Sequence, residues 1–308
     1  MRTYQQLQAI LGGTAIATAL VISIPQPSVA LTGREVNNIA REITVLIQSK
    51  QGGHGSGFII ARNGNTYSVL TAYHVVDREG EYGLITSDQQ AYEIDYSKVQ
   101  RLPDVDLAVV EFTSDKDYQV AKLGTAETSE GQDVFVSGWP GLGAVGQRAN
   151  NSVTRQFTDG RISGYLSQPV LGYEMTYTNV TRGGMSGGPV LDAGGRVVGV
   201  HGMGDKETTT GLLPLLREGF SEEAAARISN QIKIGFNYAI PVSTFLRLAP
   251  QAGIYLSVQV DNAPAPELGE VYVAQPPDER DTIDDVNRTF DTINRGVGVI
   301  RGIQRIFR

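Results

Sequence analysis

A serine, a histidine and an aspartate stand in three separate stretches whose residue types together could carry out nucleophilic catalysis. Ser186 lies in the glycine-rich stretch GGMSGGPV, His74 follows the apolar run LTAY, and Asp106 opens the apolar run DLAVV. A serine hydroxyl is a weak nucleophile at neutral pH, and it needs a neighbouring base whose pKa lies near 7. Histidine supplies that base, and a carboxylate fixes its tautomer and stabilises the imidazolium. The sequence therefore predicts acyl transfer to Ser186, with His74 as base and Asp106 as orienting carboxylate.

The aspartate and the serine each have an alternative interpretation. Asp104 and Asp77 are the other acids that could orient the histidine, but the apolar strand-like run after Asp106 favours that residue. The pattern G-M-S-G-G around Ser186 also fits the nucleophile elbow of α/β-hydrolases. That fold needs a helix after the serine and a histidine at the end of the triad order, whereas a strand-like run and a turn follow Ser186 here. An esterase of that fold is therefore disfavoured.

Composition excludes several other classes of function. The chain has 308 residues, a formal charge of -7 and no run of Lys and Arg, so we expect no nucleic-acid partner. It has no cysteine, which excludes a thiol nucleophile and any cysteine-bound metal. The three histidines, His54, His74 and His201, lie far apart and none belongs to an H-E-x-x-H pattern. We therefore expect neither a metal site nor a cofactor.

The order His, Asp, Ser together with G-x-S-G-G-P resembles the trypsin-like serine proteases of the chymotrypsin clan. The likeness covers about residues 40–250 and is strongest to the bacterial HtrA/Deg proteases and the glutamyl endopeptidases. It implies a serine endopeptidase that acts on protein or peptide substrates with His74, Asp106 and Ser186 as its triad. It also implies that the backbone N–H groups of Gly184 and Ser186 form the oxyanion hole, as the flanking glycines permit.

Two departures from the family pattern matter. Digestive members have an aspartate before the nucleophile, which pairs with a newly cut N-terminus, whereas this chain has Met185, so that route of activation is not expected. HtrA proteins carry a PDZ domain after the protease, but about 58 residues follow Pro250, so no PDZ domain is expected in this chain.

Short strand-like runs separated by Gly, Asn and Asp predict an all-β fold. The resemblance implies two antiparallel six-stranded β-barrels within residues 31–250, the first at about 40–130 and the second at about 131–250, with substrate in the cleft between them. Two helices are expected, one over SEEAAARISNQI at 221–232 and one from Pro241 to about Leu248. The strand-like runs are Ile43–Ile47, Gly57–Ala61, Tyr67–Ala72, Leu107–Phe112, Val134–Ser137, Val190–Asp192 and Val197–Val200.

Residues 1–30 are typical of an export signal. Arg2 lies in a short polar start, residues 9–24 are apolar, and Ser28-Val29-Ala30 resembles a signal-peptidase site. An uncleaved anchor is the alternative, although the apolar stretch is short for a spanning helix. We therefore expect a secreted or periplasmic protein.

Two further segments have open interpretations. Residues 251–280 are rich in Pro and acid and are expected to be a linker, and 281–308 carry an apolar stripe with helical spacing. This C-terminal segment is either a docking helix, for self-association or a membrane surface, or a frayed tail, because three glycines weaken the helix. The long insertion 204–233 is either a lid or disordered.

The substrate pocket of the clan is lined by residues 179–182 and 200–204, which contain no acid, so a preference for Lys or Arg is not expected. Thr181 and His201 stand where glutamyl endopeptidases have the Thr and His that bind a substrate carboxylate. A hydroxyl and an imidazole N–H can both donate to a carboxylate, which favours cleavage after Glu. A small apolar pocket near Met203 is the alternative.

Two residues near the motifs receive structural interpretations only. His54 is interpreted as a loop residue ahead of a strand, and Trp139 as a packing residue. A different class also stays open, a non-catalytic binding protein that has kept the protease fold.

Overall fold

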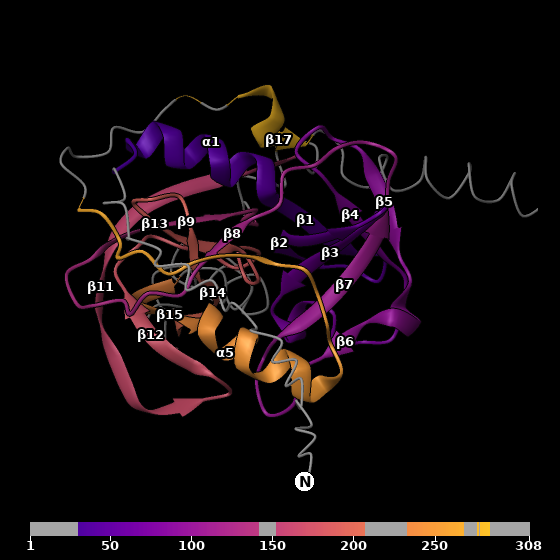
Figure 1. Ribbon diagram of the computed structural model, residues 1–308. Coiled ribbons are helices and arrows are strands. Elements are labelled where there is room, and N and C mark those ends of the chain that lie inside the picture. The colour runs from indigo at the N-terminus through magenta and orange to yellow at the C-terminus, as the bar shows by residue number, and fades with distance from the viewer. Residues whose placement is uncertain (1–29, 142–151, 207–232, 268–275, 277, 284–308) are drawn as a thin grey trace, which may run out of the picture.

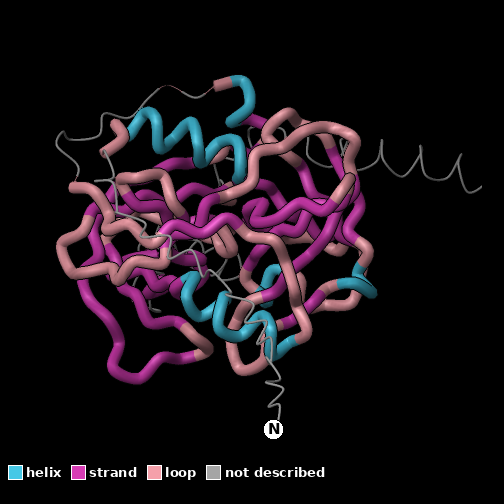
Figure 2. The backbone as a smooth tube through the Cα atoms, in the orientation of Figure 1, coloured by secondary structure: helices cyan, strands magenta, loops and turns pink. Residues whose placement is uncertain are grey.

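Two β-sheets lie side by side in the protein, and short helices lie at their margins (Figure 1; Figure 2). The computed structural model describes residues 30–141, 152–206, 233–267, 276 and 278–283. Strands dominate these residues, so the predicted all-β fold is confirmed. The signal segment, the predicted helix 221–232, nearly all of the insertion 204–233 and residues 284–308 lie outside the described residues.

The first sheet has seven antiparallel strands in the order β5-β4-β1-β2-β3-β7-β6. Its edges, β5 and β6, are not paired to each other, so this sheet is curled rather than closed, unlike the predicted six-stranded barrel. Side chains close the gap, since Tyr92 of β5 packs on Phe112 of β7 with ring centroids 4.8 Å apart. The strands are β1 (Thr44–Ser49), β2 (His54–Asn63), β3 (Thr66–Thr71), β4 (Tyr82–Ile85), β5 (Ala91–Ile94), β6 (Gln100–Arg101) and β7 (Ala108–Thr113).

The second sheet has the order β13-β9-β11-β12-β15-β14-β8-β16, and a further pairing of β13 with β14 closes six of these strands into a barrel. The prediction of a six-stranded second barrel is therefore confirmed. Its strands and their two parallel additions are β8 (Lys122–Gly124), β9 (Asp133–Gly138), β11 (Gln156–Val170), β12 (Tyr173–Tyr177), β13 (Pro189–Asp192), β14 (Val197–Lys206), β15 (Lys233–Pro241) and β16 (Gln259–Asp261).

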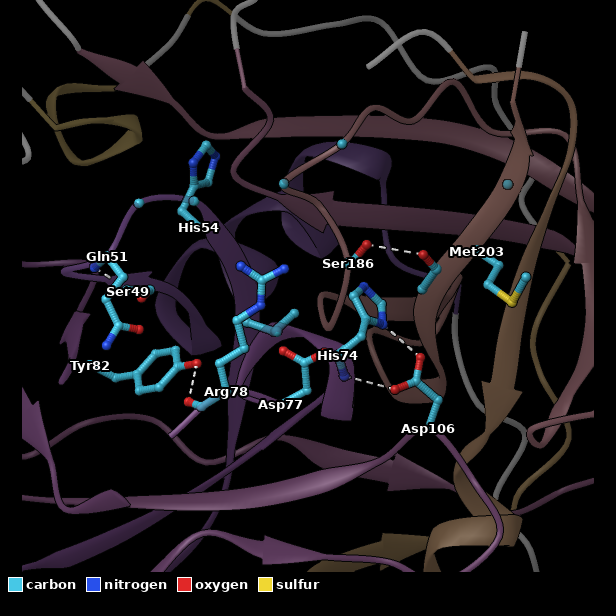
Figure 3. A pocket seen from close by; sticks show the side chains of 17 residues that line it. Ser49, Gln51, His54, His74, Asp77, Arg78, Tyr82, Asp106, Ser186 and Met203 are labelled. Atoms are coloured by element: carbon cyan, nitrogen blue, oxygen red, sulfur yellow. Dashed lines mark hydrogen bonds and ion pairs between the residues drawn. The ribbon is translucent and has the colours of Figure 1, made fainter. Parts of the chain in front are cut away.

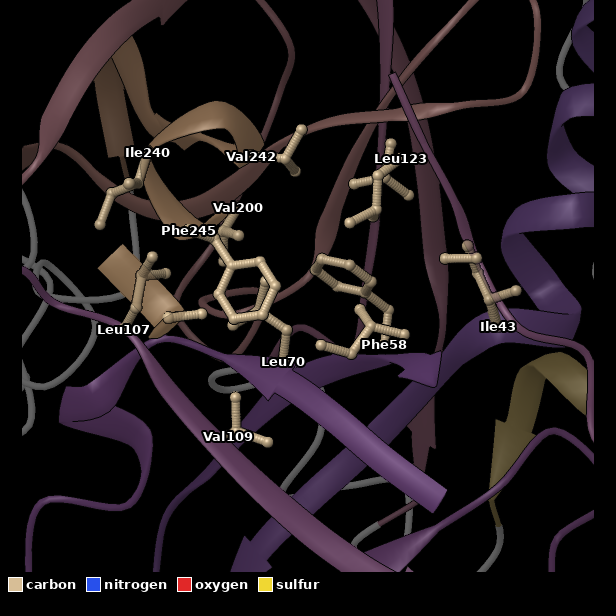
Figure 4. Packing of buried hydrophobic residues seen from close by; sticks show 14 of the residues in the cluster. Ile43, Phe58, Leu70, Leu107, Val109, Leu123, Val200, Ile240, Val242 and Phe245 are labelled. Carbon is tan, nitrogen blue, oxygen red and sulfur yellow. The ribbon is translucent and has the colours of Figure 1, made fainter. Parts of the chain in front are cut away.

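One hydrophobic core joins the two sheets (Figure 4). Phe58 and Leu70 of the first sheet share this core with Val200 of the second sheet and with Phe245 of helix α5 (Val242–Leu248). The helix begins directly after Pro241, as predicted, because the fixed φ of proline suits the entry to a helix. Phe245 is 1% exposed, and its truncation to alanine would cost about 3–5 kcal/mol of stability. The packing therefore sets how the two sheets face each other.

Helix α1 (Gly33–Ile43) was not among the predicted elements. It begins with a capping box, in which the Thr32 side chain accepts from the Glu35 N–H and the Glu35 side chain accepts from the Thr32 N–H. This reciprocal pair satisfies two amides that the first turn would otherwise leave unpaired. The T-x-x-E signal was present in the sequence, so the helix could have been predicted from it.

The segment predicted to be a linker contacts the folded core in its described part. β16 pairs in parallel with β8. The described residues that open the segment 281–308, with its predicted helical spacing, are also packed, and β17 (Thr282–Ile283) pairs with β10 (Val153–Thr154) as a strand. Asp281 is buried between Arg41 of α1 and Arg155, with Arg155 Nε 2.6 Å from its carboxylate. The described C-terminal residues therefore belong to the packed structure.

Among the described residues, short 3₁₀ turns lie at Tyr73–Val75, Tyr96–Lys98, Ala249–Ala252 and Glu279–Asp281.

Candidate active site

His74 and Asp106 meet because their two strands are paired side by side. β3 ends at Thr71, whose register partner is Ala108 of β7, so the turn after β3 faces the residues that precede β7. Asp106 Oδ2 lies 2.6 Å from His74 Nδ1, and Asp106 Oδ1 accepts the His74 backbone N–H at 2.8 Å (Figure 3). Because a carboxylate only accepts hydrogen bonds, Nδ1 carries the ring proton. The Nε2 atom of His74 is thereby left as the basic nitrogen.

Of the three candidate acids, Asp106 is the one that contacts His74. It is 9% exposed, whereas Asp104 and Asp77 are exposed. Burial works to raise the pKa of Asp106, but hydrogen bonds from the His74 ring, from Tyr173 and from the His74 backbone outweigh it, so this pKa lies below its ordinary value. The carboxylate is therefore ionised at neutral pH and can hold the imidazole in one tautomer.

Ser186 lies in the same cavity, on the second barrel (Figure 3). Its hydroxyl donates to the carbonyl of Gly202 at 3.0 Å, so the hydrogen bond runs to the backbone of β14 rather than to the His74 ring. Catalytic hydrogen bonds are often formed only when substrate is bound.

The backbone around Ser186 has a positive φ at Gly184 and at Gly187, a conformation that only glycine adopts readily. Gly184 has φ +98°, and a Cβ there would lie 2.5 Å from His54 Nε2 and from the Trp139 carbonyl. Among the described residues, the amides of Gly184 and Ser186 donate to no partner, and both residues line the cavity. An oxyanion hole requires such N–H groups, free of other partners and two residues apart at the cavity wall.

Ser56 of β2 supports this loop from the first sheet, and sequence reasoning did not identify it. Its N–H donates to the Ser186 carbonyl at 2.7 Å, and its hydroxyl donates to the Gly184 carbonyl at 2.9 Å. These bonds hold the two carbonyls against the first sheet and away from the cavity. The G-S-G sequence at 55–57 was a weak signal by itself.

His54 lies differently from its predicted place. It is the first residue of β2, half-buried, and its Nε2 lies 2.9 Å from the Trp139 carbonyl while the residue lines the cavity. Burial lowers the pKa of His54, so the ring is neutral at pH 7 and its Nε2 donates to that carbonyl. The packing role predicted for Trp139 agrees with its 1% exposure and its contacts with Leu46 and Ile85.

The predicted specificity residues are buried beside the cavity and are not among the residues that line it. Thr181 is 2% exposed and its hydroxyl donates to Asn237 Oδ1 on β15. His201 is fully buried on β14, and its Nδ1 is hydrogen-bonded to the hydroxyl of Tyr177. Burial raises the pKa of Tyr177 well above its ordinary value, so this hydroxyl stays protonated.

The cavity that contains His74, Asp106 and Ser186 has a volume of about 650 Å³ and draws its walls from both sheets. The first sheet and its loops supply Ser49, His54, His74 and Arg78, and the second supplies Gly183, Gly184, Ser186 and residues 202–204. Its volume lies in the range of ligand-binding cavities in proteins. In the part of the chain that the structure describes, no three His, Asp or Glu side chains are grouped so as to hold a metal ion.

Comparison with known proteins agrees with this fold. Residues 55–200 match the family model described as a trypsin-like peptidase domain. The serine protease Do-like HtrA of Bacillus subtilis is 28% identical over 166 residues, which is 51% of this chain and 34% of that protein. This chain thus spans about a third of the length of that relative.

A crystal structure of an inactive serine-to-alanine mutant of Rv3671c from Mycobacterium tuberculosis has a similar fold. The TM-score is 0.51 at 19% identity, and the match covers 75% of this chain and 97% of that one. At this identity the likeness shows the chymotrypsin-like fold alone. Residues 55–200 are thus similar to a trypsin-like peptidase domain and lie within a chymotrypsin-like fold. Among the described residues, no helix is long and apolar enough to cross a membrane.

Proposed function

We propose that the protein is a serine endopeptidase that hydrolyses peptide bonds through an acyl-enzyme, with His74, Asp106 and Ser186 as its triad. The observation that carries this proposal is the 2.6 Å pairing of Asp106 with His74 Nδ1 in the cavity that also contains the Ser186 hydroxyl. The pairing leaves His74 Nε2 basic and directed to the cavity side, where a nucleophile needs its base.

The reaction follows from these positions. The Ser186 hydroxyl passes its proton to His74 Nε2 and its oxygen attacks the carbonyl carbon of the substrate, while Asp106 stabilises the imidazolium. The amides of Gly184 and Ser186 donate to the oxyanion that forms. The tetrahedral intermediate then collapses, the C–N bond breaks and His74 gives its proton to the leaving amine. Water, deprotonated by His74, hydrolyses the acyl-enzyme and restores Ser186.

A serine-directed fluorophosphonate tests the proposal against a binding protein that has kept the fold. The wild-type protein should be labelled and should cleave a denatured protein substrate, whereas Ser186→Ala should do neither. Ser163→Ala is a suitable control, because Ser163 lies on β11 of the same barrel and its hydroxyl donates to Thr176. Absence of labelling in folded wild-type protein would favour the binding protein.

The preference for Glu before the scissile bond is a finer proposal. What supports it is the likeness to glutamyl endopeptidases at Thr181 and His201, because a hydroxyl and an imidazole N–H can both donate to a carboxylate. The Thr181 hydroxyl donates to Asn237, so it must exchange that partner to bind a substrate carboxylate. Matched peptides with Glu, Leu or Val at this position decide between this pocket and an apolar one beside Met203, which is 44% exposed. Glu should be cleaved fastest, and His201→Gln should remove that advantage.

We also propose that residues 1–30 direct export and that the C-terminal segment mediates self-association or binding to a membrane surface. N-terminal sequencing of the mature protein should begin at Leu31, after the small-residue site. A chain that ends at Ile283 keeps the buried Asp281 and removes the apolar stripe. If its mass in solution and its binding to anionic liposomes equal those of the full chain, residues 284–308 have neither role.

A further inference from the structure

A hairpin tip of the second barrel contacts the acid of the triad on the first sheet. The hydroxyl of Tyr173, the first residue of β12, donates to Asp106 Oδ2 at 2.6 Å, and the Asp106 N–H donates to the carbonyl of Leu171 at 2.9 Å. Tyr173 is 2% exposed. We propose that Tyr173 is a positioning residue, which holds the Asp106 carboxylate in the orientation that pairs with His74. This inference rests on the proposed protease activity.

The hairpin tip is shaped to make this contact. Leu171 has φ 51°, a conformation that non-glycine residues seldom adopt, and Gly172 has φ 87°. A Cβ on Gly172 would lie 2.8 Å from Cγ1 of Val105, the residue directly before Asp106. Such close approach and backbone strain persist only where the surrounding structure holds them. The tip is therefore clamped against the Asp106 loop, and Tyr173 follows it directly.

The tyrosine hydroxyl also occupies the place of a missing side chain. A Cβ on Gly202 would lie 1.8 Å from the Tyr173 hydroxyl oxygen and 2.6 Å from its Cζ. Gly202 is the residue whose carbonyl accepts the Ser186 hydroxyl. The absence of a side chain at Gly202 thus gives Tyr173 access to Asp106, at the position where the acid and the nucleophile strand come together.

The contact is that of a donor with a carboxylate. Burial, and next the charge of Asp106, raise the pKa of Tyr173 far above its ordinary value, so the hydroxyl stays protonated. Oδ2 of Asp106 then receives two hydrogen bonds, from Tyr173 and from the His74 ring, and Oδ1 receives the His74 backbone N–H. Without the tyrosine hydroxyl, Oδ2 keeps only its bond to the ring, and the carboxylate is less restrained in rotation.

Two effects should follow from removal of this hydroxyl. The freer carboxylate holds the imidazole less well, which lowers kcat. The charge of Asp106, without the hydrogen bond from Tyr173, acts more strongly on His74, which moves the acidic limb of the kcat/KM profile to higher pH. The other charged or titratable groups that line the cavity, His54, Asp77, Arg78 and Tyr82, are unchanged in such a variant.

The experiment compares Tyr173→Phe with Tyr67→Phe. Tyr67 is an equally buried tyrosine on β3, and its hydroxyl donates to the Lys116 carbonyl at 2.8 Å, so its variant loses a buried hydrogen bond that does not involve Asp106. Tyr173→Phe should lower kcat by about ten-fold, the size expected for one hydrogen bond to a charged group, with KM little changed. It should also raise the pH of the acidic limb, and Tyr67→Phe should do neither.

A readout without turnover separates this inference from the proposed function. The His74 Nδ1–H proton, bonded to Asp106, should give a low-field NMR resonance that moves in Tyr173→Phe and stays in Tyr67→Phe. If the protein has no peptidase activity, the resonance still tests whether Tyr173 acts on the Asp106–His74 pair. An unchanged resonance and pH profile in folded Tyr173→Phe would overturn the positioning role. If Tyr173→Phe does not fold, Gly202→Ala, which displaces the hydroxyl, must change the same two readouts, or the inference is wrong.

Discussion

The hydroxyl of Ser56, on the first sheet, donates to the carbonyl of Gly184, on the second, at 2.9 Å. The same hydroxyl accepts the backbone N–H of Trp139 at 2.9 Å, so both the proton and a lone pair of this side chain are used. The bond fixes the peptide group that follows Gly184 at its carbonyl end. The loop of the second barrel that is proposed to bind the oxyanion is thus supported by a side chain from the first sheet.

Ser56→Ala should therefore lower kcat while KM changes little. The Gly184 carbonyl belongs to the peptide whose N–H is that of Met185, between the two proposed oxyanion amides. Loss of the bond from Ser56 frees this peptide, so the Gly184 and Ser186 amides on either side of it are held less firmly. We expect a loss of about ten-fold, less than the 10²–10³ for removal of an oxyanion donor itself. Steady-state kinetics with Ser68→Ala as control, another buried serine of the first sheet, measures the effect. Equal kcat in the two variants would contradict the role of Ser56.

Gly184→Ala should abolish most activity without unfolding the protein. The new Cβ would lie 2.5 Å from His54 Nε2 and from the Trp139 carbonyl, in a backbone conformation with φ +98°. The loop must move to relieve the clash, and the N–H groups move with it, which should lower kcat by about 10²–10³. Gly131→Ala is the matched control, because Gly131 also has a positive φ but no atom lies within 4 Å of its Cβ position. Normal kcat in Gly184→Ala would argue against an oxyanion hole at this loop.

Asp106→Asn should reduce kcat by roughly 10⁴, because the amide stabilises the wrong imidazole tautomer. The fold should survive, because the amide oxygen in the Oδ1 position can still accept the His74 backbone N–H. Circular dichroism and kcat at pH 7 measure the two effects. Asp104→Asn, at an exposed acid two residues earlier, should remain fully active.

Asp281 should make stability depend on pH. Burial works to raise its pKa, but the hydrogen bonds and charges of Arg41 and Arg155 outweigh this, so its pKa is lower in the folded protein than in the unfolded chain. A lowered folded-state pKa contributes stability that is complete above the unfolded value of about 4 and is lost as the pH falls toward the folded value. Urea unfolding of the wild type should therefore show falling stability below about pH 4.

Asp281→Asn should weaken that dependence and destabilise the protein at pH 7 by about 3 kcal/mol, because two buried guanidinium groups lose their shared counter-charge. Asp278→Asn is the control, at a half-buried acid three residues earlier whose side chain bonds Arg280. Similar unfolding free energies for both variants would show that the described C-terminal residues contribute little to the fold.

The sequence alone determined the parts of this protein that depend on local order. The strand before His74, the strand after Asp106 and the glycines around Ser186 were each readable from a few neighbouring residues, and so was the helix after Pro241. Apolar runs and turn residues report local backbone preference, which needs no knowledge of distant partners. Helix α1 was also readable from Thr32 and Glu35, and its omission was a missed signal rather than a limit of the sequence.

Only the tertiary structure decided which distant side chains meet. Tyr173 reaches Asp106 across 67 positions, Ser56 reaches Gly184 across 128, and Arg41 reaches Asp281 across 240. These hydrogen bonds depend on how the two sheets dock through their shared core, and no periodic pattern in the chain encodes a contact between one particular tyrosine and one particular acid. The local motifs that carry the proposed triad were therefore readable from the sequence, whereas the groups that hold its residues in place follow from packing.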